Sequence, residues 1–324
     1  LWVNEYGLDE LRLPGQWWLD WDNGTVRRLQ AELQQGVMRL GQREAQPAMQ
    51  VQSLPLRLDY QRSGSSQSLQ VEDFGFRLDD NHWPAGRLQL HWQDAESAWQ
   101  LHAEHLALQP LARLLARLLP DQAGLLGQLA PEGYLQQLQV SGERGLDWQA
   151  LQFSARLQDV GIAAWQGAPA MHGIDGVITG SPASGQLQLD ARDWSLHLPR
   201  LFPEAWHYQH ALGRFDWHWS PQQGFDLSSD GVRVEGEEGR IGVVLGLQLP
   251  PAPADPHMQL RVALHDSHAR WHRRYLPTRS PAFLPAVDAW LVGAELDGRV
   301  PLGIFSYQGS LAADADPDAR RFDL

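Results

Sequence analysis

Cysteine and lysine are both missing from the 324 residues of this chain. The absence of Cys excludes disulfide frameworks, Cys-ligated metals and thiol nucleophiles. All 26 basic residues are therefore Arg, and 39 acidic residues outnumber them to give a formal net charge of −13. Such an acidic chain is unsuited to nucleic acid, because phosphate contacts require basic side chains. It should not dock electrostatically on anionic lipid head groups for the same reason.

A long apolar run is also missing. A membrane span needs about 20 nearly unbroken apolar residues, and the best window, residues 106–130, is interrupted by Arg113, Arg117 and Asp121. The chain begins at Leu1 without Met. We therefore interpret it as a piece of a longer protein, whose targeting signals lie outside the sequence given.

What the chain does contain is strict alternation of apolar and polar residues. A period of two places the apolar side chains on one face of a strand and the polar side chains on the other. Strands of this kind build antiparallel sheets with one dry and one wet face. The alternating segments are residues 88–92, 151–153, 187–190, 215–219, 232–235, 241–249 and 258–264.

Turn-forming residues separate these segments. Gly, Pro and Ser at 62–67, 181–185 and 220–224 predict hairpin loops. Helix is predicted at 110–119, where Leu recurs at helical spacing, and again at 121–129. A further short helix is predicted at 285–292, and 314–320 is interpreted as a solvated loop. The helical insertion could cap the sheet, cover one of its edges or separate two sheet segments.

Two groups of polar residues deserve comparison with known chemistry. His265, His268 and His272, with Asp266 and Asp288 nearby, have short spacings of the kind metal sites use, as do His102 and His105. The simpler interpretation is surface His in a polar loop, and we predict no metal. Carboxylate pairs such as Asp79-Asp80, Asp20/Asp22 and Glu235/Glu237/Glu238 keep a carbohydrate-active function open; their simpler role is solubility and turn formation.

Catalytic motifs are absent from the sequence. It contains no G-x-S-x-G elbow, no phosphate-binding loop and no G-x-G-x-x-G fingerprint. No nucleophile is recognisably placed beside a base. We therefore expect a protein that is not an enzyme and that needs no cofactor.

The apolar face of the alternating strands allows two interpretations. Periodicity alone favours a β-sandwich whose own residues fill the core. A single curved sheet would instead form a trough, and a trough too wide to be filled by its own side chains must hold something apolar.

Several stretches carry a resemblance to a known family. They are Leu13-Pro14-Gly15-Gln16-Trp17-Trp18-Leu19-Asp20-Trp21-Asp22-Asn23-Gly24, Pro131-Glu132-Gly133-Tyr134-Leu135, and the succession Tyr275-Leu276-Pro277, Ala289-Trp290-Leu291, Gly298-Arg299-Val300 and Tyr307-Gln308-Gly309-Ser310-Leu311. Together they resemble the YhdP family of bacterial envelope proteins, within the wider AsmA-like group, over nearly the whole chain.

This resemblance implies a fold and a function. Members of the family have an inner-membrane helix, absent from this sequence, followed by a long periplasmic part. That part is an elongated, curved β-sheet with an apolar groove, similar to bridge-like lipid transfer proteins. The implied function is the movement of phospholipid between inner and outer membranes. The resemblance carries no catalytic residues.

We therefore expect one elongated β-groove segment over residues 1–324, with long antiparallel strands in a twisted, curved, half-open sheet and a helical insertion at about 108–130. Its expected partners are phospholipid acyl chains, with no nucleic acid. The alternatives are a carbohydrate-binding module and a purely structural β-sandwich. Alternation alone assigns the lipid-binding groove to Leu88, Leu90, Trp92, Leu151, Phe153, Leu187, Leu189, Phe215, Trp217, Trp219, Val232, Val234, Val243, Leu245, Leu247, Leu260, Val262 and Leu264.

Overall fold

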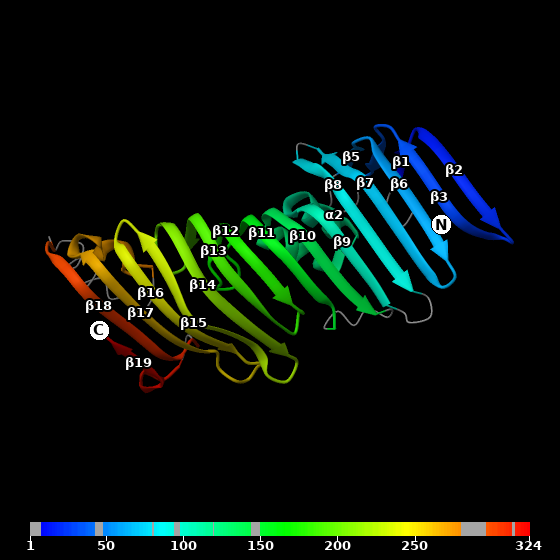
Figure 1. Ribbon diagram of the computed structural model, residues 1–324. Coiled ribbons are helices and arrows are strands. Elements are labelled where there is room, and N and C mark those ends of the chain that lie inside the picture. The colour runs from blue at the N-terminus through cyan, green and yellow to red at the C-terminus, as the bar shows by residue number, and fades with distance from the viewer. Residues whose placement is uncertain are drawn as a thin grey trace. The chain divides into compact units, whose positions relative to one another are not determined.

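The computed structural model describes residues 8–42, 48–79, 81–93, 98–118, 120–143, 150–279, 296–312 and 315–324. Within them the chain is mainly β, and its 19 strands belong to one antiparallel sheet that does not close into a barrel. The mainly β fold predicted from alternation is confirmed, and the single open sheet agrees with the family resemblance rather than with the sandwich that periodicity alone favours. The chain divides into two compact units, Leu1–Leu157 and Gln158–Leu324 (Figure 1).

Unit 1 is a sheet with a side branch. Its strands are β1 (Leu8–Arg12), β2 (Gly15–Asp22), β3 (Thr25–Leu33), β4 (Val37–Leu40), β5 (Met49–Ser53), β6 (Leu56–Ser63), β7 (Ser66–Leu78), β8 (Asn81–Gln93), β9 (Ala98–Ala107) and β10 (Glu132–Glu143). Antiparallel pairing joins β2, β3, β6, β7, β8, β9 and β10 in that order. The branch β1–β4–β5 joins the far end of β7, which is 13 residues long and pairs with β6 through its first half.

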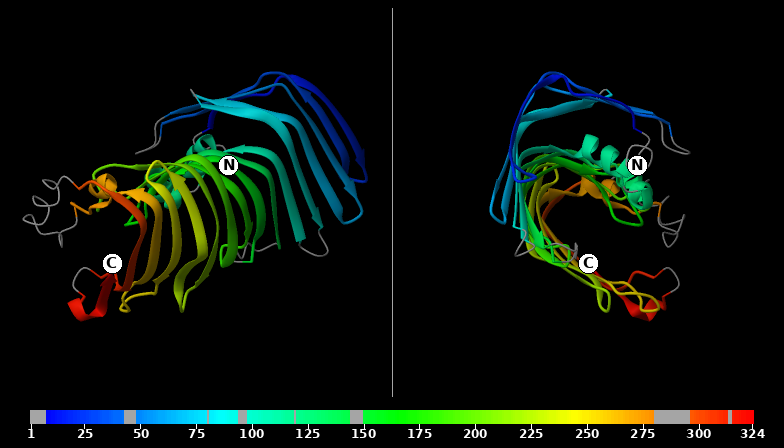
Figure 2. Two further views of the ribbon diagram at one scale, coloured as in Figure 1. Left: turned by 60° about the vertical axis from the view of Figure 1, so that its left-hand side comes forward. Right: turned by 90° about the vertical axis from the view of Figure 1, so that its right-hand side faces the viewer.

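Two helices separate β9 from β10 in the sequence. They are α2 (Leu108–Leu118) and α3 (Pro120–Leu129), so the predicted insertion is confirmed, although α2 starts two residues earlier than its predicted first residue, Pro110. α2 packs against β8, β9 and β10, and both helices lie on the concave side of the unit-1 sheet (Figure 2). Of the three roles considered for the insertion, this position supports a cap over the sheet.

Unit 2 is a meander in which each strand pairs with the next. Its strands are β12 (Ala170–Gly180), β13 (Ser184–His197), β14 (Trp206–Ser220), β15 (Gly224–Gly236), β16 (Gly239–Leu249), β17 (His257–His268), β18 (Arg299–Ser310) and β19 (Arg320–Asp323). Strand β11 (Gln152–Ile162) contains the boundary between the units. The hairpins predicted at 181–185 and 220–224 connect β12 to β13 and β14 to β15.

Aspartates bend several of the long strands. Asp73, Asp193 and Asp266 have positive φ angles of 59°, 53° and 55°, and each lies at a residue that the strand pairing skips. Asp tolerates this left-handed conformation better than most residues, because its short side chain can hydrogen-bond locally. Beside Asp73 the register between β7 and β8 shifts by one residue, and such an extra residue in one strand bends and twists it. Some of the many carboxylates therefore shape the sheet, beyond the solubility and turn roles expected of them.

The sequence interpretation differs from the structure near the C-terminus. Strand β17 continues four residues past Leu264 and leads directly into a 3₁₀ helix, η1 (Ala269–Tyr275), which was not predicted. Residues 315–320, expected to be loop, contain the short helix η2 (Pro317–Ala319) and the first residue of β19. The helix predicted at 285–292 lies outside the described residues.

Candidate functional site

One face of the unit-2 sheet carries large apolar side chains in strand after strand. Directly opposed residues of an antiparallel ladder point to the same face, and the register opposes Leu187 to Phe215, Trp217 to Leu227, and Leu227 to Leu247. We call this surface the apolar face of unit 2. It comprises Leu187, Leu189, Ala191, Ala211, Phe215, Trp217, Trp219, Phe225, Leu227, Val232, Val234, Ile241, Val243, Leu245, Leu247, Leu249, Met258, Leu260, Val262, Leu264, Phe305 and Tyr307.

The groove residues predicted in unit 2 all lie on this face. Register shifts in β14 and β15 preserve their alignment, so that Val232 opposes Val243 and Val243 opposes Val262. The prediction omitted Phe225, Leu227, Ile241, Met258, Leu249, Phe305 and Tyr307, although the same alternation marks most of them in the sequence. That this face binds lipid stays a prediction.

Unit 1 has a corresponding apolar face. The register runs Trp17, Ala31, Leu58, Val71, Leu88, Ala103 and Leu138 in one row, and Leu19, Leu29, Tyr60, Leu69, Leu90, Leu101 and Val140 in the next. The predicted residues Leu88 and Leu90 belong to these rows, and Trp92 opposes Trp99 beside them. Trp92 also stacks with Tyr60, with 6.0 Å between ring centroids.

The other two predicted groove residues flank the start of β11. Leu151 precedes the strand, and its side chain approaches Gly142, so a Cβ at Gly142 would lie 2.6 Å from the Leu151 Cδ2. Gly142 opposes Trp99 in the β9–β10 ladder, which places Leu151 next to the unit-1 apolar face. Phe153 is half-buried, and its spacing of two places it on the same face of β11 as the buried residues Ala155 and Leu157.

Burial changes steadily along the apolar face of unit 2. On β16, Ile241 is 8% exposed and Leu249 at the far end is 40% exposed. The three residues of this face between them, Val243, Leu245 and Leu247, are half-buried. Val232 and Val234 on β15 are buried, whereas Phe225 and Leu227 near its other end are half-buried. On β15 and β16 one end of this face is therefore covered by the protein itself and the other end is not, whereas on β18 Tyr307 is 8% exposed and packs against Phe322 of β19.

Helix η1 covers the buried end. Tyr275 at its end packs on Trp206, with 5.0 Å between ring centroids, and its hydroxyl lies 3.3 Å from the Tyr208 hydroxyl. A Cβ added to Gly236, which shares a face with Val234, would meet the Tyr208 ring at 3.0 Å. Tyr208 therefore lies on the apolar face. Figure 2 shows η1 on the inner side of the bent sheet, so the apolar face is the concave one.

A buried ion pair accompanies this aromatic cluster. Glu238, in the turn between β15 and β16, is 1% exposed and accepts a hydrogen bond from Arg274 of η1. Burial raises the pKa of Tyr208 to about 12. Burial also raises the pKa of Tyr275, and the neighbouring Tyr208 hydroxyl and Glu238 carboxylate add to the effect. These hydroxyls are therefore neutral hydrogen-bonding groups under ordinary conditions.

The opposite face of each sheet carries mainly polar side chains, with exposed apolar exceptions such as Trp18 in unit 1 and Val244, Leu302 and Ile304 in unit 2. Arg28 and Asp59 form an ion pair of 2.7 Å across β3 and β6, and this hydrogen bond lowers the pKa of the Asp59 carboxyl. A hollow of about 650 Å³ on this polar side of unit 1 is lined by such residues, including Gln30, Asp59 and Gln70. It contains no recognisable catalytic arrangement.

The histidines considered as metal ligands are separated by the strand geometry. His102 and His105 both lie within β9, where a spacing of three places them on opposite faces. His268 lies 3.2 Å from Asp297, and the Nδ1 of His272 lies 2.9 Å from the Ala269 carbonyl. Asp288 lies outside the described residues. In the part of the chain that the structure describes, no cluster of His and carboxylate side chains is arranged to hold a metal ion.

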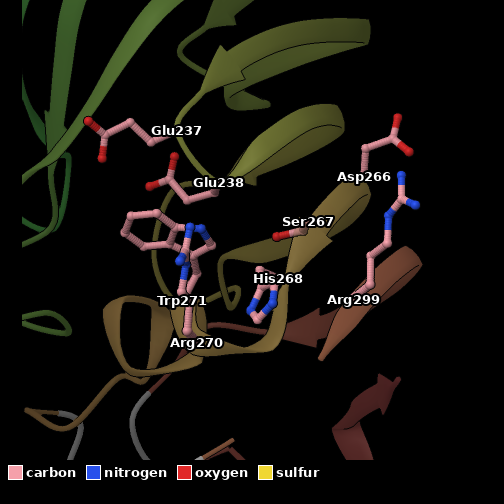
Figure 3. A pocket seen from close by; sticks show the side chains of 8 residues that line it. All are labelled: Glu237, Glu238, Asp266, Ser267, His268, Arg270, Trp271 and Arg299. Atoms are coloured by element: carbon pink, nitrogen blue, oxygen red, sulfur yellow. The ribbon is translucent and has the colours of Figure 1, made fainter. Parts of the chain in front are cut away.

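A second hollow lies next to η1, at the end of the apolar face of unit 2. Its volume is about 380 Å³, and it is lined by Glu237, Glu238, Asp266, Ser267, His268, Arg270, Trp271 and Arg299 (Figure 3). Sequence reasoning had considered Glu237 and Glu238 only as a possible carboxylate pair and His268 only as a metal ligand. Glu237, Glu238 and His268 line one hollow because the turn between β15 and β16 lies beside η1. Alternation along the sequence does not reveal this contact.

The fold and this apolar face define a class of protein: an open antiparallel sheet whose concave face is lined with apolar side chains. The chain belongs to the YhdP family, whose profile, described as YhdP protein, matches residues 2–317. Membership indicates an AsmA-like envelope protein. Comparison with curated proteins and with solved structures gives no match. None of the described helices has the length and apolar character needed to cross a membrane.

Proposed function

We propose that the apolar face of each unit is a groove surface that binds phospholipid acyl chains, and that the protein conducts phospholipid between the inner and outer membranes. The main support for this proposal is that side chains on the concave face of unit 2 are buried near η1 and more exposed toward the other end. Its side chains are large and apolar, yet toward the uncovered end they remain half-exposed. Because exposed contiguous apolar surface is unfavourable in water, such a face is typical of a binding surface.

Acyl chains fit the chemistry of this face. Burying each methylene gains about 0.8 kcal/mol, so contact with about ten of them gains about 8 kcal/mol without any polar recognition. The face offers rows of Leu, Val and Phe at strand spacing rather than one deep pocket. A surface of this kind holds a chain at many equivalent positions, as a conduit requires.

Membership of a family of envelope proteins supports the setting that we propose. We place the protein in the periplasm, held at the inner membrane by a segment outside the sequence given. Its partners in this proposal are phospholipids and, through that segment, a membrane. Catalysis, a cofactor and nucleic acid have no part in it.

The alternatives have less support. A self-filled β-sandwich needs two facing sheets, whereas the described strands belong to one. A carbohydrate module needs aromatic rings free to stack on sugars, a condition that the exposed Trp17, Trp18 and Trp21 of β2 meet but Trp217 does not. The Trp217 ring instead lies against Gly185, where an added Cβ would clash with it at 2.2 Å, and its Nε1 donates to the Ser181 carbonyl at 3.2 Å.

A pair of neighbouring substitutions tests the proposal. Leu245→Asp places a carboxylate on the apolar face, and Val244→Asp places the same group on the opposite face of β16, where Val244 is 46% exposed. Native mass spectrometry and organic extraction would measure the phospholipid carried by each purified protein.

We expect the wild-type chain and Val244→Asp to carry phospholipid and Leu245→Asp to lose most of it while its circular dichroism spectrum is unchanged. Wild-type protein without lipid that also fails to take up a photo-crosslinkable phospholipid contradicts the proposal. If Leu245→Asp alone unfolds, Leu245 is a core residue, and Leu247→Asp, nearer the uncovered end, takes its place in the comparison.

A further inference from the structure

Three of the residues that line the hollow next to η1 each carry a buried polar atom without a hydrogen-bond partner. Among the described residues, Glu238 Oε2, Ser267 Oγ and His268 Nδ1 have no hydrogen-bond partner. Glu238 is 1% exposed and Ser267 is 4% exposed. Buried side-chain polar atoms nearly always have a partner, so three exceptions lining one hollow of about 380 Å³ call for an occupant.

The three atoms share one property, which is that each can accept a hydrogen bond. An ionised carboxylate only accepts, and the other oxygen of Glu238 already accepts from Arg274. The His268 Nε2 lies 3.2 Å from the Asp297 carboxylate, which places its proton on Nε2 and leaves Nδ1 as an acceptor. The Ser267 hydroxyl both donates and accepts. The missing partner is therefore a group rich in N–H or O–H donors.

The charged groups around the hollow further restrict which kind of ligand it can bind. Glu237 and Asp266 add negative charge to the lining, and Arg270 and Arg299 add positive charge. Asp266 is already paired with Arg240, and Arg270 lies over the Trp271 ring at 5.4 Å from its centroid. In Figure 3, Arg299 extends beside Asp266, whereas Glu238, Ser267, His268 and Trp271, with Arg270 beside Trp271, surround the opposite part of the hollow. That part is rich in acceptors and aromatic surface.

We propose that this hollow binds a primary ammonium group through Glu238, Ser267 and His268. A primary ammonium carries three N–H donors and a positive charge, which suits a set of acceptors that includes a buried carboxylate. Arg270 lines the same hollow and carries a positive charge that would attract an anion attached to that amine. The chemistry matches a phosphoethanolamine, either as a phospholipid headgroup or as a small soluble amine.

The position favours the headgroup, an inference that rests on the proposed function. Ser267 follows Leu264 on β17, at the covered end of the apolar face of unit 2. A lipid whose headgroup occupied the hollow would have its acyl chains beside the rows of Leu and Val that begin there. The protein would then prefer ethanolamine lipids to choline lipids of the same acyl composition, because a quaternary ammonium has no N–H to donate.

Loading from vesicles tests this preference. The purified chain is incubated with equimolar phosphatidylethanolamine and phosphatidylcholine of identical acyl chains, and the bound lipids are quantified by mass spectrometry. One hydrogen bond to a charged group changes affinity by about tenfold, so we expect at least about fivefold enrichment of the ethanolamine lipid. Ser267→Ala and His268→Phe should bring the ratio close to one without reducing total bound lipid. Ser229→Ala, which changes a buried Ser outside the hollow, should keep the enrichment.

Free amines provide the second arm. Binding of free ethanolamine and of choline is measured by NMR titration of the wild-type chain and of Ser267→Ala. Ethanolamine binding that Ser267→Ala abolishes supports the ammonium site, even if the lipids are not discriminated, and then identifies a soluble source. Equal loading of both lipids together with no binding of free ethanolamine overturns the ammonium site. If neither lipid loads at all, the proposed function fails, and the free-amine titration still decides about the hollow.

Discussion

Both ends of the apolar face of unit 2 are built from alternating apolar residues, but the protein covers one end and not the other. At one end, η1 and its neighbours bury Ala191, Ala211, Trp194 and Tyr208 to 7% exposure or less. At the other end, Leu187, Trp217 and Leu247 are half-buried, and Leu249 is 40% exposed. The covered end is a conventional core, which stabilises the fold. The uncovered end contributes less to stability and leaves its surface for binding.

The largest difference should appear when an aromatic side chain is removed from the covered end. Trp194 is 7% exposed and packs on Tyr208 with 5.2 Å between ring centroids. We expect Trp194→Ala to reduce the free energy of unfolding by about 3–5 kcal/mol, because a large cavity remains. Urea denaturation measures the loss. A loss below that of Leu247→Ala would remove the distinction between the two ends.

The buried ion pair should come next. Arg274→Ala leaves the Glu238 carboxylate buried without its cation, and the expected loss is about 3 kcal/mol. The double variant Glu238→Gln with Arg274→Met removes both charges and should recover part of that loss. If the double variant is less stable than Arg274→Ala by urea denaturation, the pair stabilises the fold through more than mutual compensation.

Alkaline pH should weaken the covered end selectively. Burial raises the pKa of Tyr208 to about 12 from an unfolded value near 10. The folded state thus disfavours the phenolate, so this contribution is complete below pH 10 and is lost as the pH rises from 10 through 12. The loss should reach about 2–3 kcal/mol, and Tyr208→Phe should reduce it. No lysine titration overlaps with this range, and equal pH dependence in both proteins would contradict the assignment.

At the uncovered end, a similar truncation should have a small effect. Leu247 is half-buried and opposes Leu227 and Met258. Leu247→Ala should cost about 1 kcal/mol, since part of the side chain already contacts water and no closed cavity forms. The same variant should reduce bound phospholipid if this end binds acyl chains. Parallel measurements of stability and lipid content would separate the two effects.

The polar face should show the smallest effect of all. The hydrogen bond from Arg28 lowers the pKa of Asp59, so the ion pair stabilises the fold above that pKa and is lost as the pH falls through it. Both side chains are partly exposed, and pairs of this kind contribute little. Asp59→Asn should therefore lower stability by less than Leu247→Ala at neutral pH. The two proteins should converge in stability below the pKa of Asp59, which acid titration of unfolding can follow.

Much of the sheet could be predicted from the sequence, because alternation is a local property. It identified the long strands, their hairpin loops and the residues that share a face. It did not reveal which end of that face is covered, because the cover depends on contacts such as Trp206 with Tyr275 and Glu238 with Arg274, which join residues far apart in the chain. A seven-residue 3₁₀ helix such as η1 also has too few turns to produce a periodic signal.

The bulges illustrate a second limit. An Asp within an alternating segment looks like an ordinary polar residue of the wet face. Asp193 and Asp266 instead adopt a left-handed conformation and are left out of the pairing with β14 and β18, whose register is the same on either side of them. After each of these aspartates, the buried side chains continue with Trp194 and Ser267 instead of keeping to every second residue. A prediction that takes every second residue throughout therefore assigns Trp194 and Ser267 to the wrong face.

Because the uncovered end of the apolar face is proposed to bind lipid, the stability of the folded protein should depend on how much lipid is bound. A ligand that binds only the folded sheet adds RT ln(1 + [L]/Kd) to its stability, which is about 2.7 kcal/mol at one hundred times the dissociation constant. The melting temperature would then rise with the concentration of lipid and fall as the protein is delipidated. For an open sheet of this kind, the melting temperature therefore depends on the amount of bound lipid as well as on the stability of the fold.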